Sequence, residues 1–527
     1  MSDASLTYRS SGVDVEANLE ANRRIQSYIR RTYTDRVLTR GGLFGGAVRL
    51  AGLADPPNRS YLAGRLVTAE GGSPEQGSRR IARSCRRRWL PDAEPIAFLD
   101  YLAAARLEAD RAADLVGLFS ETFCSAPQIP IIGGETAEMP DVFQQGAWEV
   151  VGAIFAVGEA GAERPAKAKA RAEVDLSTLR ELEQPALVFS MDGVGTKTKI
   201  GVSTGRTAGL AEDIIHHCLD DILCQGARGI GFMLYLGCHE RDERLVAPVV
   251  QAAERCCRSN GMVLLEHLIA EKPDLYRPGE IDVCGTIVGA VDARRLIQGR
   301  EIRPGDMLLG LPSSGLHTNG YTLARKALLE RGGLSLDQHP EELGTTVGQA
   351  LLEPHMNYAP LVLPLLEDAE GEGAIKGIAH ITGGGLKDNL ERILPATVRA
   401  EIRIDSWKPP PIFQMIRRCA NIPLEDPVGK GMYESFNMGI GLVLVAAPEH
   451  VERIQRRVRC GDREAVVIGR VLGCEGDSAA GGVRSGGVRA GGSQADGAES
   501  RRAGSGGART EGRSPQTKQP EQRVRLL

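Results

Sequence analysis

The sequence predicts an α/β protein of two or more domains, on three observations. Its 527 residues are too many for one ordinary hydrophobic core. Short apolar runs, such as residues 186–189 and 307–311, predict buried strands, and stretches with apolar residues at helical spacing, such as 212–223 and 322–331, follow them. An internal repeat adds a second copy of a strand-and-helix unit in the amino-terminal half.

The composition indicates a cytoplasmic protein. The net charge of −4 gives the whole chain no attraction to nucleic acid or to a membrane surface. No apolar run reaches the length of a transmembrane helix, and residues 1–13 lack the basic-then-apolar form of a signal peptide. The eleven cysteines are scattered without C-x-x-C spacing, so we expect reduced thiols in a reducing compartment.

The first expected element is a helix over residues 16–33, and a glycine cluster at residues 41–46 follows it. The cluster contains Gly41, Gly42, Gly45 and Gly46. Backbone amides in such a cluster could cover phosphates, because glycine lets the chain approach a ligand closely. A flexible connector fits the same residues equally well.

Residues 54–183 differ in composition from the rest of the chain, and we expect them to form an insert with irregular flanks. Residues 55–95 are strongly basic, and residues 160–182 are rich in Ala, Arg and Glu, which predicts a linker with some helix. A basic run can bind nucleic acid. No aromatic stacking platform accompanies it beyond Trp89, so a solvated surface segment is the favoured interpretation.

Between these flanks lies the first copy of the internal repeat, over residues 97–158. Residues 98–102 recur as 232–236, and residues 137–143 recur as 270–276. A helical stretch and an apolar strand follow the first of these segments in each copy. Each copy covers roughly sixty residues, about half of a small domain.

The two copies differ where the first has Gly-Gly-Glu-Thr, at residues 133–136, and the second has Glu-His-Leu-Ile, at residues 266–269. The second copy therefore lacks the carboxylate of Glu135 and the hydroxyl of Thr136. If the two glycines need a positive φ, the second copy cannot form the same turn without strain.

The central motif is Asp-Gly-Val-Gly-Thr-Lys at residues 192–197, directly after a predicted buried strand. Its glycines permit a tight turn whose amides could bind an anion. Asp192 could hold a divalent cation, and Lys197 could neutralise a phosphate. The helical stretch that follows ends near Asp220 and Asp221, which could supply a second carboxylate. A β-turn with surface charges and a solvated acidic pair are the alternative interpretations.

We expect a second domain over residues 294–474 and a disordered tail over residues 475–527. Residues 312–321 place hydroxyls, glycines, an amide and the imidazole of His317 at a strand-to-helix turn, which suits a phosphate or a polar substrate. His317 could act as an acid or a base. Residues 380–386 again place a polar group and glycines before a helix. The tail has few apolar residues with which to offset its ordering entropy.

With these motifs assembled, the sequence resembles the aminoimidazole ribonucleotide synthetases, also called phosphoribosylformylglycinamidine cyclo-ligases. The matching motifs lie at residues 6–14, 41–46, 133–140, 192–197, 221–227, 305–321, 380–386 and 436–441. Several of them are long and specific, so a chance match to all of them is excluded.

The resemblance implies an α/β, two-domain PurM-like fold. Residues 1–53 and 184–293 would form the ATP-binding amino-terminal domain, with a β-barrel-type dimer interface, and residues 294–474 would place helices around a mixed sheet. It implies ATP-dependent ring closure of formylglycinamidine ribonucleotide in purine biosynthesis, with release of ADP and phosphate. The implied partners are this substrate and a second copy in a homodimer, without membrane or nucleic acid.

The resemblance also implies roles for individual residues. Asp192 and Asp221 would hold Mg²⁺, Lys197 would contact the phosphates of ATP, and His317 would face the substrate as a catalytic residue. The nucleotide would lie against Gly41, Gly42, Gly45, Gly46, Gly193, Gly195 and Thr196. The substrate would lie against Ser313, Ser314, Asn319, Thr382 and Gly383.

Two departures from the family pattern bear on these roles. A long insert separates the glycine cluster from the Asp192 strand, and the intact Gly-Gly-Glu-Thr motif lies in this insert. The insert has no copy of residues 192–197 or of Asp221, so it cannot form a complete second site. Glu135 and Thr136 are therefore possible site residues, which would dock in place of Leu268 and Ile269.

Three hypotheses follow from these observations. The first is an active cyclo-ligase. The second is a catalytically impaired relative that keeps the dimer scaffold and nucleotide binding, which the altered motif at residues 266–269 motivates. The third is another ATP-using member of the same superfamily, which is disfavoured because no cysteine precedes Cys85 and the sequence ends in leucine.

Overall fold

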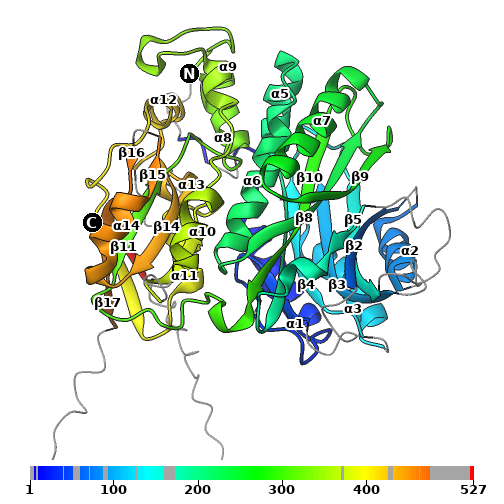
Figure 1. Cartoon of the computed structure of the whole chain (residues 1–527). Helices are drawn as coiled ribbons and strands as arrows, with labels where there is room; N and C mark the ends of the chain where they lie inside the picture. Colours follow the sequence, from blue (N-terminus) through cyan, green and yellow to red (C-terminus); the bar gives the residue numbers. More distant parts are fainter. Residues whose placement is uncertain are drawn as a thin grey trace, which may run out of the picture.

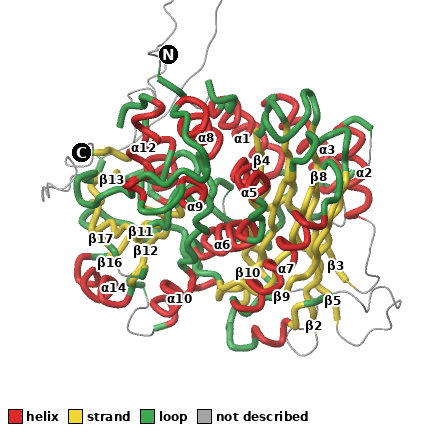
Figure 2. The backbone as a smooth tube through the Cα atoms, turned by 90° about the horizontal axis from the view of Figure 1, so that it is seen from above, coloured by secondary structure: helices red, strands yellow, loops and turns green. Residues whose placement is uncertain are grey.

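The computed structural model has two lobes that lie side by side, with helix α6 (Gly209–Leu223) between them (Figures 1 and 2). It describes residues 5–7, 10–39, 41–50, 60–69, 72–86, 93–125, 128–159, 172–368, 373–424, 431–461, 463–474 and 523–527. Each lobe combines helices with sheets, so the predicted α/β class is confirmed.

The second repeat copy builds a five-stranded sheet in the amino-terminal lobe. The strands are β1 (Gly46–Arg49), β7 (Pro185–Gly193), β8 (Arg228–Cys238), β9 (Val263–Glu271) and β10 (Ile281–Asp292), in the order β1-β7-β10-β8-β9. Helix α5 (Thr198–Thr204) follows β7, and α6 and α7 (Glu243–Ser259) cover the outer face. Ile214 of α6, Val249 of α7 and Phe232 of β8 share one buried apolar cluster, which holds the helices on the sheet.

The first repeat copy builds a second five-stranded sheet of its own. The strands are β2 (Ser60–Thr68), β3 (Ala93–Ala104), β4 (Ile131–Glu138), β5 (Trp148–Glu159) and β6 (Val174–Asp175), in the order β4-β3-β5-β2-β6. Its outer face is covered by α1 (Val15–Arg30), α2 (Pro74–Arg86) and α3 (Ala109–Phe123), through side chains such as Ile29, Ile81 and Phe119.

The inner faces of the two sheets pack against each other and form the core of this lobe. One buried cluster joins Leu99 and Phe155 of the first sheet to Phe189 and Tyr235 of the second, and the rings of Phe155 and Phe189 lie 4.8 Å apart. The sheet face that the sequence analysis assigned to a dimer interface is thus covered by the first repeat of the same chain.

The carboxy-terminal lobe packs helices around a mixed six-stranded sheet in the order β12-β14-β11-β17-β13-β18. Its strands are β11 (Met307–Pro312), β12 (Ile375–His380), β13 (Val398–Ile402), β14 (Ile440–Ala446), β17 (Val466–Gly473) and β18 (Val524–Leu526), beside a short pair, β15 (Arg459–Cys460) and β16 (Arg463–Glu464). Its helices are α8 (Tyr321–Arg325), α9 (Val347–Leu351), α10 (Ala359–Glu367), α11 (Gly385–Ile393), α12 (Pro411–Ala420), α13 (Met432–Ser435) and α14 (Val451–Arg457). The predicted helix over residues 322–331 forms as α8 followed by a π-helical segment.

The expectation of irregular structure in the flank at residues 55–95 was wrong, because β2, α2 and the start of β3 lie there. The basic residues suggested an irregular segment, but they lie on one face of the amphipathic helix α2. Ile81, Ala82 and Cys85 are buried, while Arg79 and Arg80 are exposed. The far flank, residues 160–171, lies outside the described residues.

The expected disorder at the end of the chain is also wrong for its last residues. Val524 and Leu526 are buried, and β18 pairs in parallel with β13. Alternating apolar side chains and an open strand edge thus supply a stabilisation that the composition of the tail conceals. Residues 475–522 lie outside the described part of the chain.

The eleven cysteines are all free, and most are buried, which agrees with the expected reduced thiols. Among the described residues, we find no helix with the length and apolar character needed to span a membrane.

Two buried hydrogen bonds cross the core between the repeat sheets. Tyr101 Oη donates to Asp282 Oδ2 at 2.9 Å, and Tyr235 Oη donates to Glu149 Oε2 at 2.9 Å. Burial raises the pKa of Asp282 to about 7, although the hydrogen bond from Tyr101 acts in the opposite direction. The folded chain therefore holds this proton more tightly than the unfolded chain.

We predict that Asp282→Asn flattens the pH dependence of stability. The carboxyl group stabilises the fold fully only below its unfolded pKa, near 3.8, and this contribution is lost as the pH rises through about 7. At about pH 8 the loss approaches 4 kcal/mol, and the amide avoids it while still accepting from Tyr101. Urea unfolding at a series of pH values measures the effect. The exposed-site variant Asp405→Asn should keep the wild-type slope, and equal slopes for both variants would contradict the prediction.

Candidate active site between the lobes

Helix α6 brings a row of ionisable side chains to the boundary between the lobes. Asp213, His217, Asp220 and Asp221 are spaced by three or four residues, so they lie on one face of the helix. All four are buried, and carboxylates in such a position need hydrogen-bond or charge partners. Their partners come from both lobes and define the candidate site.

Asp192 and Asp221 meet at His217, as the two predicted metal ligands would have to. The His217 Nε2 atom lies 3.0 Å from Asp192 Oδ2 and 3.8 Å from Asp221 Oδ2. Burial alone would lower the pKa of His217, but the two carboxylates raise it to about 9. Ser190 Oγ also donates to Asp221 Oδ2 at 2.8 Å. The aspartates from two distant stretches thus form one carboxylate centre.

Glu135 of the first repeat joins this centre. Burial and the charge of Asp192 raise the pKa of Glu135 well above its usual range, and Asp221 acts in the same direction. Three carboxyl groups, on β4, β7 and α6, therefore feel one another's charge. The sequence analysis offered Glu135 and Thr136 as possible site residues; Thr136 is buried on the same strand.

The reason expected for the glycines before Glu135 was wrong, because neither has a positive φ. Both lie within strand β4. A Cβ atom at Gly134 would lie 2.6 Å from the carbonyl oxygen of Asp100, so glycine is needed there for close packing of β4 on β3.

The glycine cluster at residues 41–46 lies beside the carboxylate centre. Ser190 Oγ, which donates to Asp221, also lies 3.2 Å from the carbonyl oxygen of Phe44. Gly42 has a φ of +96°, and a Cβ atom at Gly46 would lie 2.2 Å from the carbonyl oxygen of Ile132 on β4. Gly41 and Gly45 complete the turn into β1.

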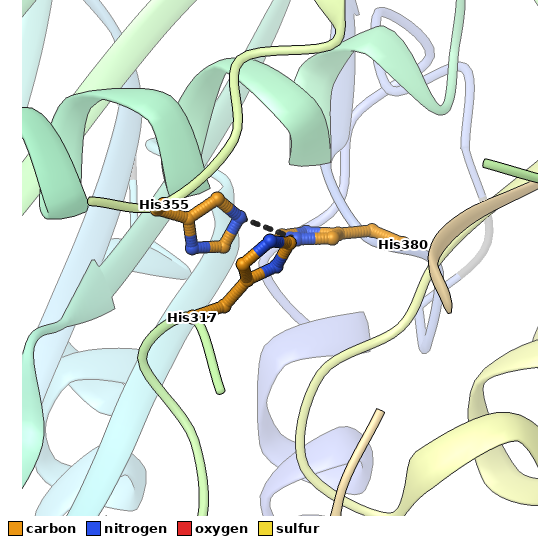
Figure 3. A group of neighbouring side chains, drawn as sticks. All are labelled: His317, His355 and His380. Carbon is orange, nitrogen blue, oxygen red and sulfur yellow. Dashed lines mark hydrogen bonds between the residues drawn. The ribbon is translucent and has the colours of Figure 1, made fainter. Parts of the chain in front are cut away.

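Three histidines of the carboxy-terminal lobe face the centre from the other side (Figure 3). His355 Nε2 lies 3.1 Å from His380 Nε2, and the ring of His317 stacks on that of His355 with centroids 4.0 Å apart. His380 Nδ1 lies 2.8 Å from Asp221 Oδ1, which links the histidines to the carboxylates. Burial lowers the pKa of all three imidazoles, so they are neutral at physiological pH.

His317 combines two features of a strained functional residue. Its φ of +64° lies in the left-handed region, and its buried Nδ1 atom has no hydrogen-bond partner among the described residues. The backbone N–H of Ser314 donates to its Nε2 atom at 3.3 Å.

Lys197 has different partners from the phosphates expected from the sequence. It is fully buried, and its Nζ atom donates to Asp213 Oδ1 at 2.7 Å, to the carbonyl oxygen of Glu353 at 2.7 Å and to that of His317 at 3.2 Å. Its amine therefore joins the two lobes. Thr196 is likewise bound across the boundary, because its hydroxyl lies 2.9 Å from that of Thr322.

The residues predicted to face the substrate divide into two groups. The hydroxyls of Ser313 and Ser314 are bonded to carbonyl oxygens of their own lobe. Asn319, Thr382 and Gly383 are partly or fully exposed. Gly193 ends β7 beside Asp192, and Gly195, with a φ of +68°, begins the 3-10 turn that follows.

Sequence reasoning missed His217 and His355 as site residues, and it selected the motif at residues 380–386 without giving His380 a role. His217 was identifiable, because it lies one helical turn before Asp221 on the same predicted face. His355 follows no strand or glycine motif, so only the fold shows that it meets His380. Within the described residues, two groups have ligand atoms close enough for one metal ion: His217, Asp221 and His380, and His317, His355 and His380.

Comparison with known proteins assigns the class. The sequence model of the AIR synthase related protein N-terminal domain matches residues 89–160 and 175–291, and that of the C-terminal domain matches residues 303–481. These matches place the chain among two-domain, AIR synthase related proteins.

Curated relatives narrow this class further. Phosphoribosylformylglycinamidine cyclo-ligase of Alkaliphilus metalliredigens (strain QYMF) is 39% identical over 293 residues, which is 56% of this chain and 82% of that protein. The enzymes of that name from Myxococcus xanthus (strain DK1622) and Geobacillus thermodenitrificans (strain NG80-2) are 40% and 39% identical, over 84% and 86% of their lengths and 56% and 58% of this chain. The chain belongs to the phosphoribosylformylglycinamidine cyclo-ligase family of enzymes.

Solved structures resemble the chain less closely. A thiamine-monophosphate kinase from Stenotrophomonas maltophilia K279a is 17% identical, with a TM-score of 0.41 over 55% of this chain and 84% of its own. The hydrogenase maturation protein HypE in complex with ATP is 19% identical, with a TM-score of 0.39 over 55% of this chain and 77% of its own.

We predict that Lys197→Met lowers the melting temperature, because it leaves Asp213 buried without its cation. Removing one partner of a buried ion pair costs about 3–5 kcal/mol. Scanning calorimetry measures the loss, and Lys408→Met, at an exposed position, serves as the control. An unchanged melting temperature together with a raised KM for ATP would favour the phosphate contact predicted from the sequence.

Proposed function

We propose that this chain closes the imidazole ring of formylglycinamidine ribonucleotide at the expense of ATP, giving aminoimidazole ribonucleotide, ADP and phosphate in purine biosynthesis. The observation that carries the proposal is the meeting of Asp192 and Asp221 at the lobe boundary, opposite a cluster of neutral histidines. The names of the curated relatives support the same reaction.

The carboxyl groups of Asp192 and Asp221 are hard oxygen ligands of the kind that Mg²⁺ prefers. Asp192 and Asp221 would hold it, and Glu135 would be a third oxygen donor, since its pairing partner Tyr101 lies against Gly193, next to Asp192. Mg²⁺ neutralises the charge of a bound triphosphate. The protonated His217 keeps the two aspartates together, because its one nitrogen lies within 4 Å of both.

The phosphates of ATP would lie against backbone amides rather than against Lys197. Gly42 and Gly195 both have a positive φ, a backbone form that can present successive N–H groups to an anion. Gly41, Gly45, Gly46, Gly193 and Thr196 complete the two turns. The amine of Lys197 supports the site from behind, since it holds the carbonyl oxygen of His317 in place.

The substrate would lie against the exposed edge of the carboxy-terminal lobe. Asn319, Thr382 and Gly383 would bind its polar groups, and Ser313 and Ser314 would shape the His317 loop. The formyl oxygen attacks the γ-phosphorus and ADP leaves; a substrate nitrogen then attacks the activated carbon, and phosphate and a proton leave.

The imidazole of His317 would take up that proton at its buried Nδ1 atom, which has no hydrogen-bond partner among the described residues. Burial and neighbouring positive charges lower its pKa well below the usual value, so a lone pair is available at physiological pH. His355 and His380 form a path from its stacked ring to Asp221.

Of the alternatives, the catalytically impaired relative rested on the loss of a carboxylate at residues 266–269. The charge of Glu135 acts on Asp192, so the loss of a carboxylate at residues 266–269 is a weaker argument for an impaired enzyme.

We propose a cytoplasmic location on the free, mostly buried thiols. The expected homodimer is not part of this proposal, since the first repeat covers the sheet face that it required.

The proposal predicts ADP release that depends on formylglycinamidine ribonucleotide. Asp192→Asn and Asp221→Asn should each lower kcat/KM by about 10²–10³-fold, because each removes charge from the metal position. A coupled assay for ADP measures both values, and the exposed-site variant Asp274→Asn is the matched control. Absence of substrate-dependent ADP release from the folded wild-type chain would reject the proposed reaction.

A further inference from the structure

The two repeat copies form sheets with the same topology. Four strands correspond: β4-β3-β5-β2 in the first sheet has the order of β9-β8-β10-β7 in the second, and each sheet has one further edge strand, β6 or β1. The pairs β3–β4 and β8–β9 are parallel, whereas the other pairs are antiparallel. Both parallel pairs have a register shift at the same place, after Phe98 in the first sheet and after Phe232 in the second.

The contacts between the copies follow an approximate two-fold axis. Phe143 pairs with Tyr276, its own counterpart in the repeat, and their rings lie 4.8 Å apart. On either side, the Gln144 N–H donates to the Leu275 oxygen at 2.8 Å and the Arg277 N–H donates to the Val142 oxygen at 2.9 Å. The hydrogen bonds Tyr101–Asp282 and Tyr235–Glu149 are a second symmetric pair. Contacts of this kind are typical of an isologous dimer.

Such an arrangement has two equivalent junctions, where the edge strand of one sheet meets the other sheet. At the first, β4 lies against β1 and β7, as the close approach of Gly46 to Ile132 shows. At the second, β9 lies against β2, where the Leu66 N–H donates to Glu266. A two-fold pair of identical sheets would have a ligand site at both junctions or at neither.

At the positions of Asp192 and Glu135, the described residues of the second junction have no carboxylate, although Glu266 lies elsewhere on β9. Strand register places Val67 of β2 where β7 has Asp192, because Gly152 pairs with Val67 as Gly285 pairs with Asp192. Register likewise places Leu268 where β4 has Glu135, since Tyr101 pairs with Glu135 and Tyr235 with Leu268.

The aspartates of α6 have no carboxylate counterpart in the aligned sequence of the first copy, where residues 87–92 lie outside the described residues. The sequence 218–223, Cys-Leu-Asp-Asp-Ile-Leu, aligns with Cys-Arg-Arg-Arg-Trp-Leu at 85–90, so arginines replace both aspartates. Leu268 also packs against the apolar core between the sheets. At these two strand positions the second junction has the apolar side chains of Val67 and Leu268, where the first has the carboxyl groups of Asp192 and Glu135.

We infer that the chain is an internal pseudo-dimer with one divalent-cation and nucleoside triphosphate site, which its first repeat completes through Glu135 without a second copy of the chain. The identity of the ligand rests on the proposed function, whereas the count of sites and the source of the third carboxylate rest on the repeat geometry. The first repeat takes the place of a second subunit: it supplies Glu135 and covers the apolar face of the second sheet.

The test counts sites without turnover. Mn²⁺ replaces Mg²⁺ as a paramagnetic probe, and the full chain is titrated with Mn²⁺ and the non-hydrolysable analogue AMPPCP. Electron paramagnetic resonance should give one bound Mn²⁺ per chain, with an affinity independent of protein concentration. Glu135→Gln should weaken this binding by about tenfold or more, because it removes a charged oxygen ligand.

Leu268→Gln is the matched control, because it makes the same side chain at the symmetry-related position. It should leave the Mn²⁺ affinity and the count unchanged. Glu135→Asp, which keeps the charge on a shorter side chain, replaces Glu135→Gln if thermal unfolding shows that the glutamine variant is not folded, and it too should bind more weakly than wild type.

Two bound AMPPCP molecules per chain, an affinity that rises with protein concentration, or wild-type binding by folded Glu135 variants would each overturn the inference. If the chain binds one Mn²⁺ that depends on Glu135 but does not close the ring, only the proposed reaction is rejected. Full ring closure with two AMPPCP molecules bound per chain rejects only the single-site inference.

Discussion

The burial of acidic side chains on α6 is the constraint on which the rest of the structure depends. A carboxylate removed from water must find a cation or hydrogen-bond donors, or the fold loses several kcal/mol. Asp213 finds Lys197 and a backbone N–H of the other lobe, Asp220 finds another such N–H, and Asp221 finds His380. Because these partners come largely from the carboxy-terminal lobe, one helix sets how the lobes face each other, and the candidate site forms where they meet.

The duplicated sheet solves a second physical problem. A sheet with helices on one face leaves its other apolar face to be covered. Here the first repeat covers it, with Phe155 packed on Phe189 and polar pairs crossing the core. Once both sheets are in one chain, the two junctions are free to differ, because a substitution at one is not repeated at the other. The apolar Leu268 can then stabilise the core at one junction while Glu135 remains at the other.

Much of the fold and site follows from local patterns, and the exceptions have physical causes. The Asp192 motif, the acidic end of α6 and the His317 loop were identified because short polar motifs after apolar runs are visible in one dimension. Lys197 was expected to contact phosphates, but its amine contacts Asp213 and two carbonyl oxygens of the other lobe. These partners come from distant parts of the chain, so a local motif does not reveal them. The flank at 55–95 was misjudged because its arginines lie on the solvent face of α2, a fact that only the apolar face opposite makes plain.

The sequence by itself determined the α/β class, the internal repeat, the family and most of the residues that gather at the site, since these depend on residue type and on short spacings. It also showed that the second repeat copy has no carboxylate in the place of Glu135. Only the tertiary structure decided that the strand of Glu135 packs near the end of the Asp192 strand while both copies keep their own sheets, and that His217, His355 and His380 join the site. The physical reason is that these meetings follow from how two sheets and two lobes pack, and packing is a property of buried surfaces rather than of neighbouring positions in the chain.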